Sequence, residues 1–342
     1  MTSLLFIFIL IEPKFETRIN LAAELEIYSK HAVFAVSSAG TLAIVDSKEY
    51  QVVFSNGTTH RRAGRSGKGP REFSHIVSVL WDETQAAFLV CDTGNNRISA
   101  WSETGQFISE DRMPAVGSAK DFQMTASKSF FYSDSYESPK WNQHYLYFKS
   151  NAQSQAQVVW QFEFPPDWKP TNIRPQEPRP YIIFMHWDVD LRYGVGSNFV
   201  VVWPHNNQLV LLDLMGKPLN QSIPMTLPRY PITQEQVDHM LLGMRDEKMR
   251  TQTRKHAVVP DFWPAVKHLI VDEQDRIWVF GFPAKVNGPH PFQVINQSSK
   301  ILGEGTIPHE AQYVKGHRLY SSYWNPEDEC LIDIYSFQMD SK

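Results

Sequence analysis

Cysteine is scarce in this sequence, which has only Cys91 and Cys330 among its 342 residues. Two cysteines are too few for a disulfide framework or a thiolate zinc site, and their spacing matches no redox motif. We therefore expect both to pack as small apolar side chains. Neither charge sign dominates, since 33 Lys and Arg residues face 37 Asp and Glu residues. The chain thus has no global attraction to nucleic acid or to anionic membranes, and we do not expect nucleic acid as a partner.

The chain also lacks an apolar run of transmembrane length. The run from Leu4 to Ile11 is far shorter than the roughly 20 residues that a membrane-spanning helix needs. Its length suits the apolar core of a signal peptide, but no Lys or Arg precedes it, and Glu12, Pro13 and Lys14 follow where small residues should mark a cleavage site. We interpret residues 1–14 as either a clipped export signal or a leading strand. Export to the periplasm or the medium is slightly favoured over a cytoplasmic location.

A repeated pattern of apolar strands and polar turns is present instead. Each copy has an apolar strand, a turn containing Asn, Asp or Gly, a second apolar strand and a closing Gly, as in an antiparallel hairpin. The clear copies span residues 44–57, 89–105 and 200–216, and weaker ones end at residues 145–148, 292–295 and 331–335. The spacing resembles the roughly 40 to 50 residues of a propeller blade, except before Gln208 and Phe292, where we expect insertions.

The pattern predicts an all-β fold, a six-bladed β-propeller of four-stranded antiparallel blades. Five or seven blades are the alternatives. Hydrophobic residues make up 42% of the chain and aromatic residues 13%, which is ample for a large core. We expect residues 15–342 to form a single propeller domain and the protein to be a monomer.

Three segments carry a resemblance to a known family. They are Asp92-Thr93-Gly94-Asn95-Asn96-Arg97-Ile98, the glycine-rich segment of residues 64–73, and the strand of residues 271–279. Together they resemble the NHL-repeat family and related bacterial six-bladed propellers. The chain departs from that family by having Arg71 where a Gly is usual. The resemblance implies a module that often binds other molecules without catalysis.

Residues 229–259 interrupt the β pattern and are predicted to contain a helical insertion. Val237, Met240, Leu241 and Met244 recur at the spacing of one helix face. Thr233 followed by Gln236 is typical of a capping box. The insertion would either cover the central channel or pack at the side of the propeller.

The basic segment of residues 60–71 is one candidate ligand site. Its Arg65, Lys68 and Arg71 could hold a phosphate, a carboxylate or RNA, although the glycine spacing is not that of a P-loop. The alternative interpretation is a solvated connector between blades. Trp203 is a further ligand-binding candidate, because it stands where Asp92 stands in the earlier copy and would be exposed at a blade edge.

His186, Asp188 and Asp190 are the candidate metal ligands. They alternate along one predicted strand, so all three would point to one side of it. Two carboxylates and an imidazole could bind a divalent metal or transfer protons. Propellers similar to the gluconolactonase and regucalcin group hold a metal in the channel, but their ligand motifs have no match here. The alternative is that these are surface polar positions.

Two functional hypotheses remain. The first is a non-catalytic binding propeller that presents its loops and helical insertion to a protein, peptide or glycan. The second is a metal-dependent hydrolase or lactonase-like enzyme with its site at the central channel. No cofactor is predicted under the first hypothesis, whereas the second requires a divalent metal in the channel.

Overall fold

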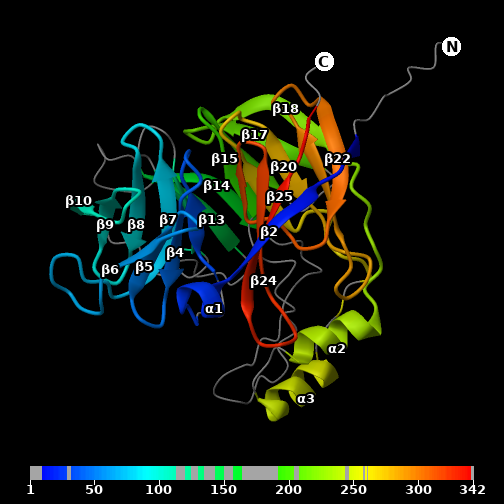
Figure 1. Cartoon of the computed structure of the whole chain (residues 1–342). Helices are drawn as coiled ribbons and strands as arrows, with labels where there is room; N and C mark the ends of the chain where they lie inside the picture. The colour runs from blue at the N-terminus through cyan, green and yellow to red at the C-terminus, as the bar shows by residue number, and fades with distance from the viewer. Residues whose placement is uncertain are drawn as a thin grey trace, which may run out of the picture.

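The fold is a ring of six small β-sheets. The computed structural model describes residues 10–28, 32–112, 120–124, 130–134, 143–149, 157–163, 192–203, 208–242, 246–256, 259 and 261–339. The first strands of the six sheets contact one another in order, and the sixth contacts the first, so the sheets surround a central channel (Figure 1). The predicted six-bladed β-propeller of antiparallel blades is confirmed.

The first three blades follow one another along the chain. Blade 1 contains β3 (Phe34–Val36), β4 (Leu42–Asp46), β5 (Gln51–Ser55) and β6 (His60–Ala63). Blade 2 contains β7 (Ile76–Asp82), β8 (Ala87–Asp92), β9 (Arg97–Trp101) and β10 (Phe107–Arg112). Blade 3 contains β11 (Lys120–Met124), β12 (Phe130–Asp134), β13 (Gln143–Lys149) and β14 (Gln157–Glu163).

Two of the last three blades, blades 5 and 6, include a strand from the start of the chain. Blade 4 contains β15 (Arg192–Val195), β16 (Phe199–Trp203), β17 (Gln208–Asp213) and β18 (Pro218–Pro224). Blade 5 contains β19 (His268–Val271), β20 (Ile277–Phe280), β21 (His290–Ile295), β22 (Ile301–Ile307) and a fifth strand, β1 (Leu10–Ile11). Blade 6 contains β23 (Tyr313–Lys315), β24 (Arg318–Trp324), β25 (Cys330–Ser336) and, outermost, β2 (Lys14–Asn20). The short helix α1 (Leu21–Leu25) follows β2 and precedes β3.

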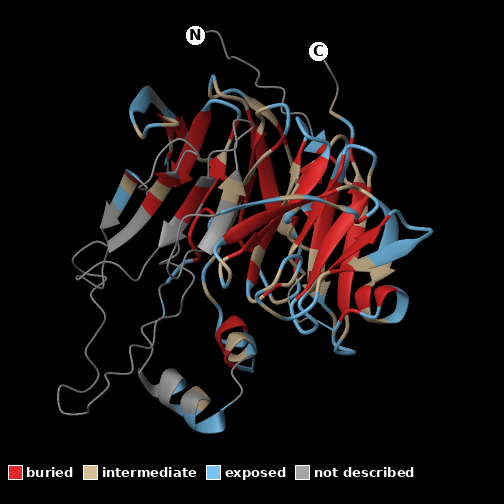
Figure 2. Ribbon diagram, turned by 90° about the vertical axis from the view of Figure 1, so that its left-hand side faces the viewer, coloured by how far each residue is buried: buried red, intermediate tan, exposed pale blue. Residues whose placement is uncertain are grey.

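The middle strands of the blades are buried because neighbouring blades cover both of their faces. Every residue of β4, β8 and β16 is buried, which explains their nearly continuous apolar sequences (Figure 2). The outer strand β10 is mostly exposed. The six second strands of the sequence repeats are β5, β9, β13, β17, β21 and β25, each the third strand of a different blade.

Buried aspartates shape the turns that follow the strands. Asp46 ends β4 and accepts hydrogen bonds from the backbone N–H groups of Lys48 and Glu49, at 3.2 and 3.3 Å. Asp92 ends β8 and holds the backbone of His75 at 2.8 Å. Asp272 follows β19, the first strand of its blade, whereas Asp46 and Asp92 end second strands. These carboxylates satisfy backbone donors and are structural.

The chain ends close the ring. β2 pairs with β25 in antiparallel register, from Lys14 opposite Ser336 to Asn20 opposite Leu331. Arg18 of β2 donates two hydrogen bonds to Asp333 of β25, Nε to Oδ1 at 2.7 Å and the second guanidinium nitrogen to Oδ2 at 3.0 Å. The Asp333 side chain is 1% exposed, so the strand pairing is locked by a bidentate ion pair whose carboxylate is buried.

β1 anchors the start of the described chain to blade 5. It pairs in parallel with β22, where Ile11 lies opposite Gly305. The glycine is required there because a Cβ atom at position 305 would lie 2.2 Å from the Ile11 carbonyl oxygen. Ile11 is 1% exposed and belongs to the same core cluster as Phe292, whereas Leu10 is 65% exposed. Residues 4–9 of the apolar N-terminal run lie outside the described residues.

The insertion between β18 and β19 contains two helices, α2 (Gln234–Leu242) and α3 (Glu247–His256). The predicted capping box is present: the Gln236 N–H donates to the Thr233 hydroxyl at 3.3 Å, and the Thr233 N–H donates to the Gln236 side chain at 3.0 Å. Val237 and Leu241 are buried, as the periodicity indicated. Met244 lies outside the described residues.

The helices lie at the face where the first strands of the blades begin, because the insertion leads into β19. α2 is attached there by a hydrogen bond of 3.2 Å from the Gln236 side chain to the Pro283 carbonyl in the β20–β21 loop. In the part of the chain that is described, no residue of α2 or α3 lines the channel cavity. No described helix has the length and apolar character needed to cross a membrane.

We expect the substitution Arg18→Met to lower the free energy of unfolding by about 3–5 kcal/mol, because it leaves the buried Asp333 carboxylate without its cation. Urea denaturation of the purified variant measures this loss. Glu16→Gln is the matched control, since it removes the more exposed ion pair with Arg318 from the same strand and should cost less than about 1 kcal/mol. Similar losses in the two variants would contradict the locking role of Arg18.

The substitution Ile11→Ala should lower the free energy of unfolding by about 2–5 kcal/mol through the cavity it leaves in the core of blade 5. The neighbouring Leu10→Ala should change it by less than about 0.5 kcal/mol, because that side chain is exposed. Both values come from the same denaturation measurement. If the Ile11→Ala variant and the wild-type protein had the same denaturation midpoint, β1 would contribute nothing to the stability of the fold.

Candidate binding site in the central channel

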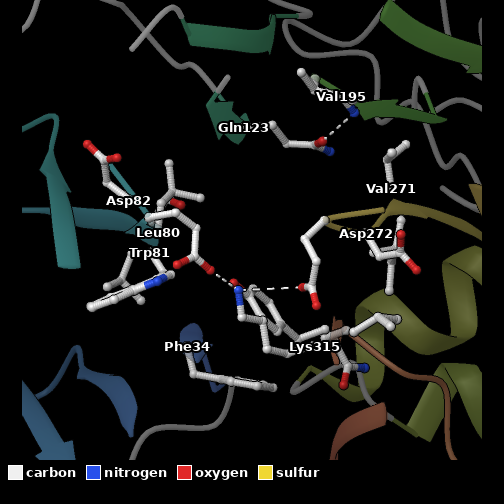
Figure 3. Close-up of a pocket in the computed structure, with 18 of the residues that line it drawn as sticks. Phe34, Leu80, Trp81, Asp82, Gln123, Val195, Val271, Asp272 and Lys315 are labelled. Atoms are coloured by element: carbon white, nitrogen blue, oxygen red, sulfur yellow. Dashed lines mark hydrogen bonds and ion pairs between the residues drawn. The ribbon is translucent and has the colours of Figure 1, made fainter. Parts of the chain in front are cut away.

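The first strands of the blades surround a cavity of about 510 Å³ in the central channel. Its walls combine aromatic, amide and imidazole side chains, including Phe34, Gln123, His268 and Tyr313 (Figure 3). Gln123 joins two blades, since its amide donates to the Tyr193 carbonyl at 3.1 Å and accepts from the Val195 N–H at 3.0 Å. A cavity of this size and mixed lining is typical of ligand sites.

Lys315 occupies one mouth of the channel, where β23 ends. Its ammonium forms an ion pair with Glu83 and lies 3.5 Å from the nearer carboxylate oxygen of Glu273. These glutamates follow β7 and β19, so blades 2, 5 and 6 meet at one cation, as the dashed lines in Figure 3 mark. The Lys315 side chain is 14% exposed.

Neighbouring groups hold both glutamates in place. Glu83 accepts a hydrogen bond from the Ser38 hydroxyl, which in turn accepts one from the Trp81 indole N–H at 3.2 Å. Glu273 accepts a hydrogen bond of 2.8 Å from the backbone N–H that follows Lys315. Burial raises the pKa of the Glu83 carboxyl, but hydrogen bonds from Lys315 and Ser38 outweigh that effect, so the pKa lies below its usual value.

Carboxylates outnumber cations in the channel lining. Among the described residues, its Asp, Glu, Lys and Arg side chains are Asp82, Glu83, Asp272, Glu273, Asp275 and Lys315. Asp272 is neutralised from outside the lining by Arg276, at 2.6 Å. Asp275 accepts a hydrogen bond of 2.7 Å from the Ser197 backbone N–H, which brings no charge. The mouth is therefore negative, and its low-dielectric walls strengthen the field that a ligand would meet.

The predicted metal ligands His186, Asp188 and Asp190 lie outside the described residues. Within the described ranges, no three His, Cys, Asp or Glu side chains are arranged to hold a metal ion. The two glutamates closest to the mouth already share the Lys315 ammonium, which occupies the position that a metal would need.

The basic segment begins in strand β6, and its residues 64–71 belong to the compact loop that leads from blade 1 to blade 2. Arg65 pairs with Glu72 at 2.7 Å, and the Gly69 N–H donates to the same carboxylate at 2.7 Å. These hydrogen bonds, first from Gly69 and then from Arg65, lower the pKa of Glu72. Arg71 adopts a left-handed φ of 61°, the conformation that glycine adopts without strain, and its guanidinium lies 5.0 Å from the Phe107 ring centre.

The three candidate cations of the segment, Arg65, Lys68 and Arg71, do not line one cavity together. Lys68 lines a separate cavity of about 640 Å³ with Arg97 and Glu110, which pair with each other at 3.1 Å. None of Arg65, Lys68 and Arg71 lines the channel cavity. Trp203 is 3% exposed in the core cluster of blades 4 and 5, so the expected exposure at a blade edge is wrong. β16, which ends at this tryptophan, is covered on both faces.

The sequence analysis did not identify the residues at the channel mouth. A signal for two of them was present, because Asp82-Glu83 and Asp272-Glu273 repeat the same pair where the first strand of a blade ends. In each pair the Asp holds the turn, and the Glu reaches Lys315. The strand β19 before Asp272-Glu273 is only four residues long, and β23, which ends at Lys315, has three residues, so neither strand forms a clear sequence pattern.

A second charged cluster lies where the first strands begin. Lys267 pairs with the Glu310 carboxylate at 2.5 Å, and the His290 ring nitrogen Nδ1 donates to the Gly281 carbonyl at 3.2 Å. Burial lowers the pKa of His290 to about 4, assisted by the Lys267 charge. For Glu310, burial raises the pKa, but Lys267 and His268 outweigh it and the value falls to about 2.

Comparison with known proteins supports the fold. Residues 31–182 match the family model DUF5128, described as a 6-bladed beta-propeller, and no curated protein matches the sequence. A member of the duf4221 family from Bacteroides vulgatus is similar at a TM-score of 0.56 and 14% identity, over 97% of this chain and 99% of that one. The closer resemblance to NHL repeats stays a prediction.

Two enzymes share the general shape at lower scores. A gluconolactonase from Xanthomonas campestris has a TM-score of 0.44 and 11% identity, over 94% of each chain. Virginiamycin B lyase from Staphylococcus aureus has a TM-score of 0.44 and 11% identity, over 96% of this chain and 90% of that one. At such identities the likeness concerns the fold alone.

The free energy of unfolding should fall on acidification in two steps. Because the folded-state pKa of His290 is below its unfolded value of about 6.5, stability is lost as pH falls from about 6.5 to about 4. Glu310 adds a second loss of stability between about pH 4.5 and pH 2, because its folded-state pKa also lies below its unfolded value. His290→Gln should remove up to roughly 3 kcal/mol of the first step, as measured by denaturation across pH. The exposed-site control His60→Gln should leave the profile unchanged.

Proposed function

We propose that this protein is a non-catalytic binding propeller and that its ligand site is the central channel with the mouth at Lys315. The observation that carries the proposal is the cavity of about 510 Å³, lined by aromatic and hydrogen-bonding side chains from several blades. A rigid ring of sheets holds these side chains in fixed positions, so a ligand would not have to order them on binding.

The bonding of the described carboxylates supports binding over catalysis. Glu83 and Glu273 are engaged by Lys315, Asp272 by Arg276, and Asp275 by Ser197. A general acid or base must be able to reach the substrate proton it transfers. Groups already fixed by several internal hydrogen bonds are better suited to recognition than to proton transfer.

A peptide or protein segment suits the channel as a partner. The lining offers Phe34, Trp81 and Tyr313 as aromatic contacts together with amide and carboxylate groups. Aromatic residues dominate the binding energy of such sites because they bury a large area at little entropic cost. A glycan would use the same aromatic contacts and is the second ligand class under this proposal.

The hydrolase hypothesis depends on His186, Asp188 and Asp190 rather than on the described mouth. It predicts a different response, because a divalent ion bound at 100 times its dissociation constant adds about 2.7 kcal/mol of stability. After chelator treatment, a melting point raised by Ca²⁺, Mg²⁺, Mn²⁺ or Zn²⁺, and no longer raised in the His186→Ala variant, would favour the enzyme and overturn the present proposal.

Selection of a peptide library on the immobilised protein tests the binding function directly. We expect the selected peptides to lose about 10- to 30-fold in affinity on Trp81→Ala, measured by calorimetry, because truncating a central aromatic anchor costs about 2 kcal/mol. Trp324→Ala is the matched control, since this tryptophan is 37% exposed on blade 6 and does not line the channel.

Two outcomes would contradict the channel as the binding site. One is a set of selected peptides whose affinity changes equally in Trp81→Ala and Trp324→Ala. The other is the absence of any peptide or glycan that binds the wild-type protein below millimolar concentration. Cooperative thermal unfolding of both variants establishes that each is folded before its affinity is compared.

A further inference from the structure

Lys315 separates two cavities. The channel cavity lies on one side of it, and a second cavity of about 490 Å³ lies on the other, lined by residues 37–40 of blade 1 and by Arg318 and Tyr320 of blade 6. Lys315, Glu83 and Glu273 are the residues that line both. The lysine side chain thus stands at the junction of the two spaces, between its two glutamates.

The two carboxylates do not hold the ammonium equally. Glu83 is in direct ion-pair contact, whereas the nearer Glu273 oxygen lies 3.5 Å away and keeps its second oxygen on a backbone N–H. An ammonium is a compact charge that cannot pair with both carboxylates in a flat, two-pronged geometry. A planar guanidinium presents several N–H donors in a fork and is the better match for two facing carboxylates.

The surroundings favour an added positive charge. Apart from Asp272, which Arg276 neutralises, the described lining has four carboxylates and one ammonium, an excess of three negative charges. Ser197 is a neutral donor to Asp275, and Thr84 and Gln85 are neutral donors to Asp82. Phe34 and Trp81 line the same cavity and offer ring faces on which a guanidinium can stack.

We propose that the channel mouth receives an arginine side chain of a partner peptide, and that Lys315 is the internal cation it displaces. This inference rests on the proposed binding function and names the chemistry of its ligand. When the arginine takes the place between Glu83 and Glu273, Lys315 swings out and the two cavities become one path. In the free protein, Lys315 thus takes the place of the ligand cation and offsets the repulsion between the two carboxylates.

The test compares two probes that differ only in charge. They are acetyl-Gly-Arg-Gly-amide and the same peptide with citrulline, the neutral isostere of arginine. We expect Lys315→Met to bind the arginine peptide at least tenfold more tightly than wild type does, by calorimetry at low salt, because the internal competitor is gone. The citrulline peptide should gain nothing. The gain should shrink as ionic strength rises and screens the carboxylates.

A second variant keeps the test independent of how well Lys315→Met folds. The double variant Glu83→Gln/Glu273→Gln retains the lysine but removes both carboxylates. It should bind the arginine peptide at least tenfold more weakly than the wild-type protein does. Equal affinities for the arginine and citrulline peptides in both variants would overturn the arginine proposal. The proposal would also be overturned if Mg²⁺ or Ca²⁺ raised the melting point of Lys315→Met and the arginine peptide did not.

The failure of this inference can be told apart from failure of the binding function. Library-selected peptides that depend on Trp81 but carry no arginine and respond to neither variant would leave the channel as a binding site and remove only its preference for arginine. If no selected peptide depended on Trp81, the binding function itself would fail.

Discussion

The pairing of β2 with β25 is the constraint on which the other features depend. Six blades placed side by side become a ring only when the last one is joined to the first, and here blade 6 is completed by the strand from the start of the chain. The Arg18–Asp333 ion pair makes that pairing specific, because Asp333 is buried and its charge needs the guanidinium. Blade 6 also supplies Lys315. The junction of Lys315 with Glu83 of blade 2 and Glu273 of blade 5 therefore exists only in the closed ring.

The same chemistry of buried carboxylates recurs around the ring with different partners. Asp46 pairs with Arg62, Asp272 with Arg276, and Asp333 with Arg18. In each case a buried carboxylate is matched by an arginine. Desolvated charges are tolerated only when paired and hydrogen-bonded, so these pairs select one arrangement of the turns. The channel mouth departs from the pattern, since its carboxylates outnumber its cations and its cation is a lysine. That departure is the observation from which we propose a cationic ligand at the mouth.

The sequence predicted the parts of the fold that local pattern controls. The third strands, such as β9 and β17, are apolar runs bounded by turn residues, and the Thr233 capping box is a contact between residues three apart. Long-range arrangements could not be read in this way. The first strands are short, and the pairing of β2 with β25 joins residues separated by almost the whole chain. Trp203 illustrates the limit, because its place at a strand end suggested exposure, whereas the stacking of blades 4 and 5 buries it.

The two faces of the propeller use charge in opposite ways. Where the first strands begin, Glu310 and Lys267 pair one to one, and burial favours the neutral form of His290, so the charges of this described cluster balance. Where the first strands end, Lys315 pairs with two carboxylates. Two further carboxylates, those of Asp82 and Asp275, accept hydrogen bonds from neutral donors. Bringing like charges together costs free energy that the rigid ring must supply. A ligand cation would relieve that repulsion without any change in the ring, which explains why recognition fits this face better than the face that carries the helices.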